Sequence, residues 1–163
     1  MVTVLILAGG KSDRMGQDKA LMDGGVKHLR ALAINAGVER IITLCGGEER
    51  KPLFDGEVWP DPPSCTSLCE VLQWAFGKID GTIQLIPCDA FKLQLDGLGL
   101  LLSSEGGVPL DEHGKRQPLL AHCPEEWNLA PSSGDVSSLF SSLPDLDAGM
   151  LTVQMKNFNT PFD

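Results

Sequence analysis

The chain is short of positive charge. It holds 13 lysine and arginine residues against 22 aspartate and glutamate residues, which gives a formal net charge of −9. Nucleic acids and anionic membranes both attract positively charged partners. We therefore expect no nucleic acid and no membrane among the partners of this protein, and favour a small anionic ligand held where positive charge is locally concentrated.

Long apolar segments are also missing. A membrane-spanning helix needs about 20 apolar residues, and the run Val2–Leu7 is far shorter. We find no signal-peptide pattern, and the five cysteines are an odd number, which favours reduced thiols over a disulfide framework. The sequence thus predicts a cytoplasmic protein.

Cysteine and histidine do not recur at the spacing of a four-ligand metal site. Cys65 and Cys69 would form one ligand pair, and His113 and Cys123 are conceivable additions, but no second pair at convincing spacing completes the set. We expect free thiols, buried or partly buried, instead.

Repeats, low-complexity tracts and clear linkers are absent from the sequence. With 163 residues, the chain is long enough for a hydrophobic core and is predicted to form one domain, residues 1–163. Apolar runs alternate with amphipathic stretches, as in an α/β fold whose parallel sheet is covered by helices. Strands are predicted at 2–7, 40–45, 57–59, 82–86, 117–121 and 151–155, and helices at 26–36, 68–76, 93–102 and 136–143.

The most informative segment follows the first predicted strand. Residues 8–21 contain three glycines, two lysines, an arginine and a serine. Glycine lets the backbone approach a ligand closely, and clustered N–H groups with cationic side chains are what a polyphosphate requires. The residue order matches neither G-x-x-x-x-G-K-[ST] nor G-x-G-x-x-G. A glycine-rich turn without a ligand is the simpler interpretation, but such a turn has no need of Arg14 and Lys19.

From Leu7 to Leu21 the sequence resembles the L-A-G-G-x-S-x-R-M-G-x-D-K-A-L signature of nucleotidyltransferases with a Rossmann-like fold. The match to the molybdenum cofactor guanylyltransferase family (molybdopterin-guanine dinucleotide biosynthesis protein A) is nearly letter for letter. The resemblance implies a three-layer Rossmann-like fold with a mostly parallel central sheet. It also implies that the nucleotide is bound by Leu7, Ala8, Gly9, Gly10, Arg14, Gly16 and Lys19.

Asp89 directly follows the predicted strand 82–86. Open α/β sheets place ligand groups at the carboxyl ends of their strands, and an aspartate there can hold Mg²⁺ against the phosphates of a nucleotide. The alternative is that Asp89 caps the next helix. Because the same chain carries the glycine-rich loop, we favour the Mg²⁺-binding role of Asp89. Cys88-Asp89 also resembles the C-D-x-P motif of the family, although the usual proline is replaced.

The last residues, 157–163, read N-F-N-T-P-F-D and resemble the closing N-x-N-T-P-x-D motif of the family. The resemblance implies that Asn157 or Asn159 shares the Mg²⁺ and phosphate site with Asp89. An Asx-turn at the end of the chain is the alternative. In the family an aspartate at the position of Asp61 lies near the nucleotide, and a turn-forming aspartate before two prolines is the alternative there.

Two segments depart from the family pattern where the base is recognised. The usual G-P-L-x-G segment is replaced by residues 66–70, which include Ser67 and Glu70, and the asparagine after the second strand is replaced by Cys45-Gly46-Gly47. The sequence also stops at Asp163, where relatives continue into a further helix. We therefore expect the phosphate half of the site to be retained and guanine selectivity to be weakened.

The resemblance implies a nucleotidyltransferase that moves GMP from GTP to molybdopterin, with Mg²⁺ as cofactor and pyrophosphate as second product. Arg14, Lys19 and Asp89 would be the catalytic residues. Molybdoenzymes or other cofactor-biosynthesis proteins are conceivable partners. Two alternatives stay open: a nucleotidyltransferase with another donor or acceptor, such as a cytidylyl or sugar-phosphate enzyme, and a non-catalytic member that binds nucleotide or a partner enzyme.

Overall fold

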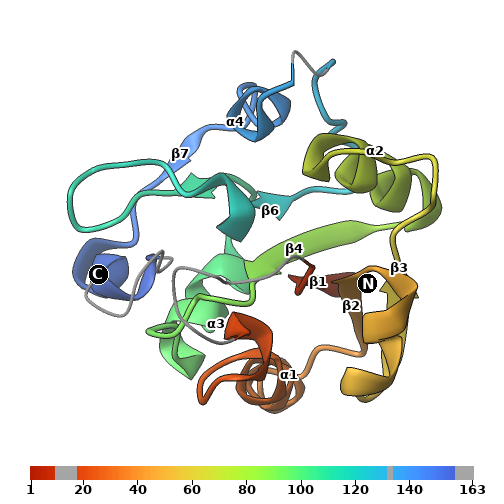
Figure 1. Ribbon diagram of the computed structural model, residues 1–163. Helices are drawn as coiled ribbons and strands as arrows, with labels where there is room; N and C mark the ends of the chain where they lie inside the picture. Colours follow the sequence, from red (N-terminus) through yellow and green to blue (C-terminus); the bar gives the residue numbers. More distant parts are fainter. Residues whose placement is uncertain (10–17, 132–133, 157–163) are drawn as a thin grey trace.

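A twisted, mostly parallel sheet forms the centre of the molecule (Figure 1). The structure is a computed structural model, and it describes residues 1–9, 18–131 and 134–156. Within those ranges five strands pair in the order β3-β2-β1-β4-β6, and only β6 runs antiparallel to its neighbour. The strands are β1 (Val2–Leu7), β2 (Arg40–Gly46), β3 (Glu57–Pro60), β4 (Thr82–Pro87) and β6 (His122–Cys123). The expected mostly parallel α/β sheet is therefore confirmed.

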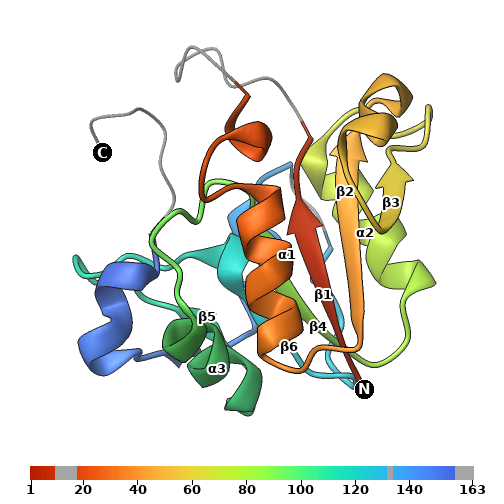
Figure 2. The ribbon, with the colours of Figure 1, turned by 90° about the horizontal axis from the view of Figure 1, so that it is seen from below.

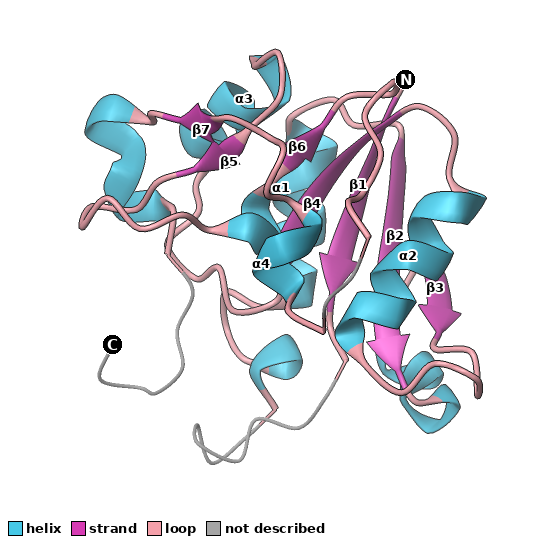
Figure 3. Ribbon diagram, turned by 90° about the horizontal axis from the view of Figure 1, so that it is seen from above, coloured by secondary structure: helices cyan, strands magenta, loops and turns pink. Residues whose placement is uncertain are grey.

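Helices cover both faces of this sheet and give the molecule three layers. They are α1 (Val26–Asn35), α2 (Leu68–Lys78), α3 (Leu95–Ser103) and the single turn α4 (Val136–Leu139). In Figure 1 α2 and α4 lie above the strands and α1 and α3 below them, and Figure 3 shows the same division from above. Side chains alternate along β1: Leu5 packs in the core under α2, whereas Val4 and Ile6 pack under α1 and α3. Because both faces of β1 are buried, its sequence is apolar apart from the buried Thr3.

The sheet order reverses at β1, which pairs with β2 on one side and with β4 on the other. In an open α/β sheet this reversal is the point where ligands bind, beyond the carboxyl ends of the strands. Figure 2 shows the arrows of β1 and β2 pointing towards that edge, while the amino terminus lies at the opposite end of β1.

Local sequence signals mark the end of α1 and the start of α2. After α1, Gly37 has a φ of 85°, a left-handed conformation that suits the residue beyond a helix end. Ser67 caps α2, because its Oγ accepts a hydrogen bond from the Glu70 N–H at 3.2 Å. The Glu70 carboxylate accepts from the N–H of Thr66 at 2.6 Å and not from that of Ser67, so the expected capping box is shifted by one residue.

Two predicted strands are wrong. Most of the segment 117–121 forms a short 3₁₀ helix, η4 (Pro118–Leu120), in which Pro118 occupies the first turn, where its missing N–H costs nothing. The segment 151–155 falls largely in the 3₁₀ helix η5 (Gly149–Gln154). Its apolar alternation is misleading, because Val153 is 42% exposed while Met155 is fully buried. A two-stranded sheet of β5 (Val108–Pro109) and β7 (Asp145–Leu146) lies beside this part of the chain.

The predicted helix 136–143 is shorter than expected, since α4 ends at Leu139. Leu139, Phe140 and Leu143 nevertheless enter the core beneath α2, so their apolar spacing does report burial. Among the helices in the described ranges, none combines the length and apolar character that crossing a membrane would require.

Candidate active site

The carboxyl edge of the sheet gathers the sequence-predicted site residues that fall within the described ranges. Those residues are Leu7, Ala8, Gly9, Lys19, Asp61 and Asp89. Gly10, Arg14, Gly16, Asn157 and Asn159 lie outside the described residues, so their roles stay predictions.

Lys19 and Asp89 come together at this edge although 70 residues separate them in the sequence. Lys19 opens the 3₁₀ turn η2 (Lys19–Leu21), and Asp89 follows the end of β4. The Lys19 Nζ lies 3.2 Å from Asp89 Oδ2, and the two side chains are 14% and 12% exposed. The fold therefore places a cation and a carboxylate, both largely shielded from water, at the point where β4 meets the end of β1.

Burial raises the pKa of the Asp89 carboxyl above its usual value, while the hydrogen bond and the charge of Lys19 act in the opposite direction. A carboxylate that has lost part of its hydration is stabilised by any cation that can reach it. The alternative role as a helix cap does not apply to α3, because that helix begins at Leu95 with Gln94 at its cap position. Asp89 is thus not the cap of that helix, and its carboxylate is paired with Lys19 instead.

The end of β1 is fixed by backbone contacts with both neighbouring strands. The Ala8 N–H donates to the Leu44 carbonyl at 2.8 Å, and the Cys88 N–H donates to the Leu7 carbonyl at 3.0 Å. A methyl group on Gly9 would lie 3.0 Å from the Gly46 Cα. The structure therefore shows a packing reason for glycine at position 9, in addition to the ligand approach predicted from the sequence.

Asp61 lies at the same edge but on its far side. Its N–H donates to the Gly46 carbonyl at 2.7 Å, and burial raises the pKa of its carboxyl. β2 and β1 separate β3, which precedes Asp61, from β4, which precedes Asp89. At about 4.8 Å between neighbouring strands, the axes of β3 and β4 stand roughly 14 Å apart. Asp61 is therefore not part of the Lys19–Asp89 pair.

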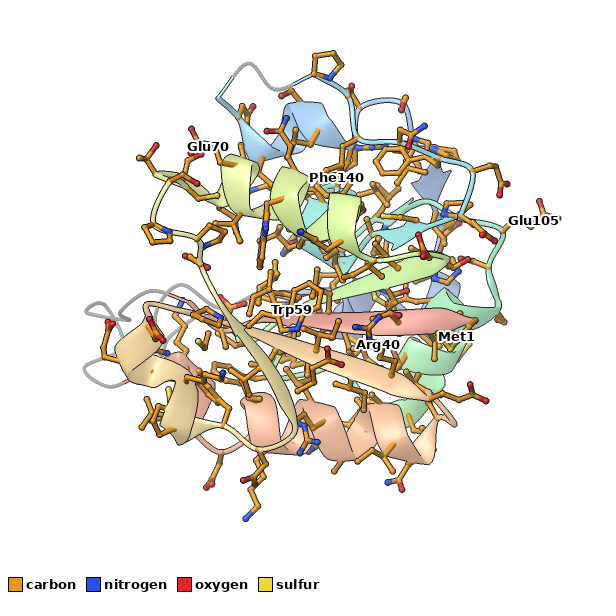
Figure 4. The ribbon with its side chains drawn as sticks, turned by 90° about the vertical axis from the view of Figure 1, so that its right-hand side faces the viewer. Met1, Arg40, Trp59, Glu70, Glu105 and Phe140 are labelled. Carbon is orange, nitrogen blue, oxygen red and sulfur yellow. The ribbon has the colours of Figure 1, made fainter. Side chains whose placement is uncertain are left out.

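The segment 66–70 replaces the expected glycine-containing segment. Its residues form hydrogen bonds with one another that cap the start of α2. The Thr66 hydroxyl and N–H both bond the Glu70 carboxylate. Figure 4 shows Glu70 at the end of the molecule that lies opposite Met1. β1 and β2 terminate at the same end as Glu70. The segment thus lies at the same end of the molecule as the predicted site, with the Glu70 carboxylate held by its own helix turn.

One residue of this edge was missed by the sequence analysis. Arg50, in the 3₁₀ helix η3 (Glu48–Leu53), donates through Nε to the Cys45 carbonyl at 2.7 Å and through Nη2 to the Ala8 carbonyl at 2.8 Å. Its Nη1 lies 2.5 Å from Asp18 Oδ2, and its side chain is 12% exposed. An arginine shortly after a Gly-Gly turn at a strand end is the only sequence signal for it.

Comparison with known proteins places this chain in a family. Residues 4–138 match the model of the MobA-like NTP transferase domain. A protein of Synechococcus elongatus named "Probable molybdenum cofactor guanylyltransferase" is 36% identical over 100 residues, which are 56% of this chain and 52% of that protein. The chain thus spans about half the length of the curated relatives it matches.

Solved structures share the fold at low sequence identity. A nucleotidyl transferase from Methanothermobacter superposes with a TM-score of 0.70 at 17% identity, covering 100% of this chain and 94% of that one. The molybdopterin-guanine dinucleotide biosynthesis protein A of Archaeoglobus fulgidus gives a TM-score of 0.66 at 15% identity, covering 98% and 93%. The family match over residues 4–138, which is most of the chain, shows that the chain belongs to the family of MobA-like NTP transferase domains.

Proposed function

We propose that this protein transfers a nucleoside monophosphate from a nucleoside triphosphate to a phosphate-bearing acceptor and releases pyrophosphate. The observation that carries the proposal is the shielded Lys19–Asp89 pair at the switch point of the sheet. GTP as donor and molybdopterin as acceptor are proposed because the curated relative is named for that chemistry.

In this reaction an acceptor phosphate oxygen attacks the α-phosphorus, and the bond to pyrophosphate breaks. The protein supplies no nucleophile, so its task is to align the reactants and stabilise negative charge. The Lys19 ammonium would neutralise the triphosphate, helped by Arg14 according to the family signature. The backbone of the segment after Leu7 would hold the phosphates.

Mg²⁺ fits the donor atoms at this edge. Asp89 offers hard carboxylate oxygens, and its burial favours a neighbouring cation. Asn157 and Asn159 remain the proposed further ligands. A bound Mg²⁺ would neutralise phosphate charge in the transition state.

The second candidate function is nucleotidyl transfer from a triphosphate other than GTP. The altered segment 66–70 favours it. Glycines expected beside the base are absent, and Glu70 is bonded to Thr66. We expect looser selectivity than a dedicated guanylyltransferase has. Competition binding of GTP, ATP, CTP and UTP with Mg²⁺ measures this, and a preference for GTP of about 10³-fold, roughly 4 kcal/mol, would contradict it.

Pyrophosphate release tests the proposed reaction itself. The purified protein is incubated with Mg²⁺, molybdopterin and each of the four triphosphates in turn. Release that needs both a triphosphate and molybdopterin supports the proposal, and release with a sugar phosphate instead would assign another acceptor. Binding of triphosphate without release under any condition would favour the non-catalytic alternative.

A further inference from the structure

A single guanidinium joins three segments at the carboxyl edge. Arg50 bonds the carbonyl of Cys45 at the end of β2, the carbonyl of Ala8 at the end of β1 and the carboxylate of Asp18. All three nitrogens that carry its N–H groups are therefore engaged. The planar fork of arginine suits such a set of acceptors, whereas the ammonium of lysine is a single point.

Asp18 connects this guanidinium to Lys19. Its other carboxylate oxygen, Oδ1, accepts from the Ala20 N–H at 3.1 Å and so caps the turn η2. Lys19 is the next residue, and its Nζ reaches Asp89. Arg50 lies on η3 and Lys19 on η2, so Arg50 influences the position of the Lys19 ammonium through Asp18.

The surroundings of Arg50 restrict its movement. Its guanidinium carbon lies 5.7 Å from the centre of the Phe54 ring, and its ion pair with Asp18 is partly buried. The hydrogen bond that Arg50 donates to Asp18 raises the pKa of the guanidinium further, so the charge is permanent. Gly9 packs directly against Gly46 between these contacts. The ends of β1 and β2 and the start of η2 therefore form one fixed unit.

We propose that Arg50 is a positioning residue for nucleotidyl transfer: it locks Asp18 and the end of β1 to β2 and thereby holds Lys19 where the triphosphate binds. The inference rests on the proposed function. It adds a residue from outside the glycine-rich signature and assigns it a role exerted through Lys19.

The first test separates geometry from charge. Arg50→Lys keeps a positive charge but cannot reach three separate acceptors, so kcat/KM for the triphosphate should fall by about 10²-fold, as for a catalytic group displaced by about 1 Å. The matched control is Arg40→Lys, since Arg40 also holds a carboxylate, that of Glu57, but at the start of β2. That variant should keep its activity within about twofold. Full activity of Arg50→Lys would overturn the proposal.

The second test asks whether Arg50 acts through Lys19. In a Lys19→Ala background, adding Arg50→Lys should lower kcat/KM by less than about threefold, because residues that act as a unit are not additive. Multiplication of the two single effects would show that Arg50 acts independently, and the positioning role would be rejected.

Amide hydrogen exchange tests the structural part without any activity. The N–H groups of Leu21 and Met22 bond the carbonyls of Asp18 and Lys19. Their exchange should be at least tenfold faster in Arg50→Lys, with exchange in β4 unchanged. Unchanged exchange in η2 would overturn the inference even if activity falls.

Asp18→Asn covers the case in which Arg50→Lys loosens β4 as well, because it removes only the ion pair and can keep the cap. It should reproduce the faster exchange at Leu21 and Met22, and normal exchange there would count against the proposal. A wild-type protein that releases no pyrophosphate would reject the proposed function alone. The exchange experiment would still decide whether Arg50 holds η2.

Discussion

At the scale of single residues, the proposed function gives Lys19 and Asp89 new partners, a phosphate and a divalent cation. Each side chain neutralises the other in the free protein at 3.2 Å. Under the proposed function a phosphate would compete for Lys19 and a divalent cation for Asp89. Binding of the two ligands would then be coupled, because each ligand frees the side chain that the other one needs.

Asp89→Asn should separate binding from turnover. The neutral amide is a poorer Mg²⁺ ligand and a weaker partner for Lys19, so turnover should be lost. Triphosphate binding without Mg²⁺ should tighten by about tenfold, or roughly 1.4 kcal/mol. Calorimetric titration in the presence of a chelator measures the second effect. Weaker metal-free binding would show that Asp89 does not restrain Lys19.

Lys19→Ala should lower the rate of pyrophosphate release by about 10²-fold or more, as expected for loss of one preorganised charge-stabilising donor. Steady-state kinetics at saturating triphosphate give the rate. Lys27→Ala is the matched control, because Lys27 is exposed on α1. Equal rates in the two variants would make Lys19 an ordinary surface lysine.

At the scale of elements, the sequence predicts best those segments whose burial is complete. β1, β2 and β4 lie in the middle of the sheet, and their apolar runs can be read without knowing their partners. The segments that form the 3₁₀ helices η4 and η5 resemble strands in the sequence, because short apolar runs have no period that distinguishes the two. Arg50 could not be predicted, since its three acceptors come from segments that only the fold brings together.

Gly9→Ala tests how tightly β1 and β2 meet. The added methyl group would stand 3.0 Å from the Gly46 Cα, so one strand end must shift. Overpacking of this kind costs about 1–3 kcal/mol in the free energy of unfolding. Urea denaturation provides the measurement. Gly99→Ala in α3 is the control, because a methyl group there meets nothing within 4 Å and should be neutral or stabilising.

At the scale of the whole molecule, a buried pair of hydrogen-bonded polar side chains joins the edge strand β6 to β4. His122 on β6 is 4% exposed, and its Nδ1 lies 2.9 Å from Gln84 Oε1 on β4. Gln84 Nε2 donates to the Leu120 carbonyl at 2.9 Å, so its oxygen accepts and His122 carries a proton on Nδ1. Burial lowers the pKa of His122.

The stability of the fold should therefore depend on pH through His122. In the unfolded chain histidine binds its second proton below about pH 6.5, whereas in the folded protein it does so only at lower pH. The contribution of His122 is complete above pH 6.5 and is lost as pH falls towards the lower folded-state value. Urea denaturation between pH 8 and 5 should show a shallower decline for His122→Gln than for His113→Gln, in which an exposed histidine is replaced. Equal slopes would contradict the assignment.

The position of β1 also affects how the chain folds while it is being synthesised. β1 is made before both of its partners, β2 and β4, and Thr82 follows Leu7 by about 75 residues. At about 5–20 residues per second, a ribosome needs roughly 4–15 s to make that stretch. β2 emerges earlier and can cover one edge of β1. The other edge of this apolar strand then stays unpaired on the nascent chain, where it is a template for aggregation until β4 leaves the ribosome.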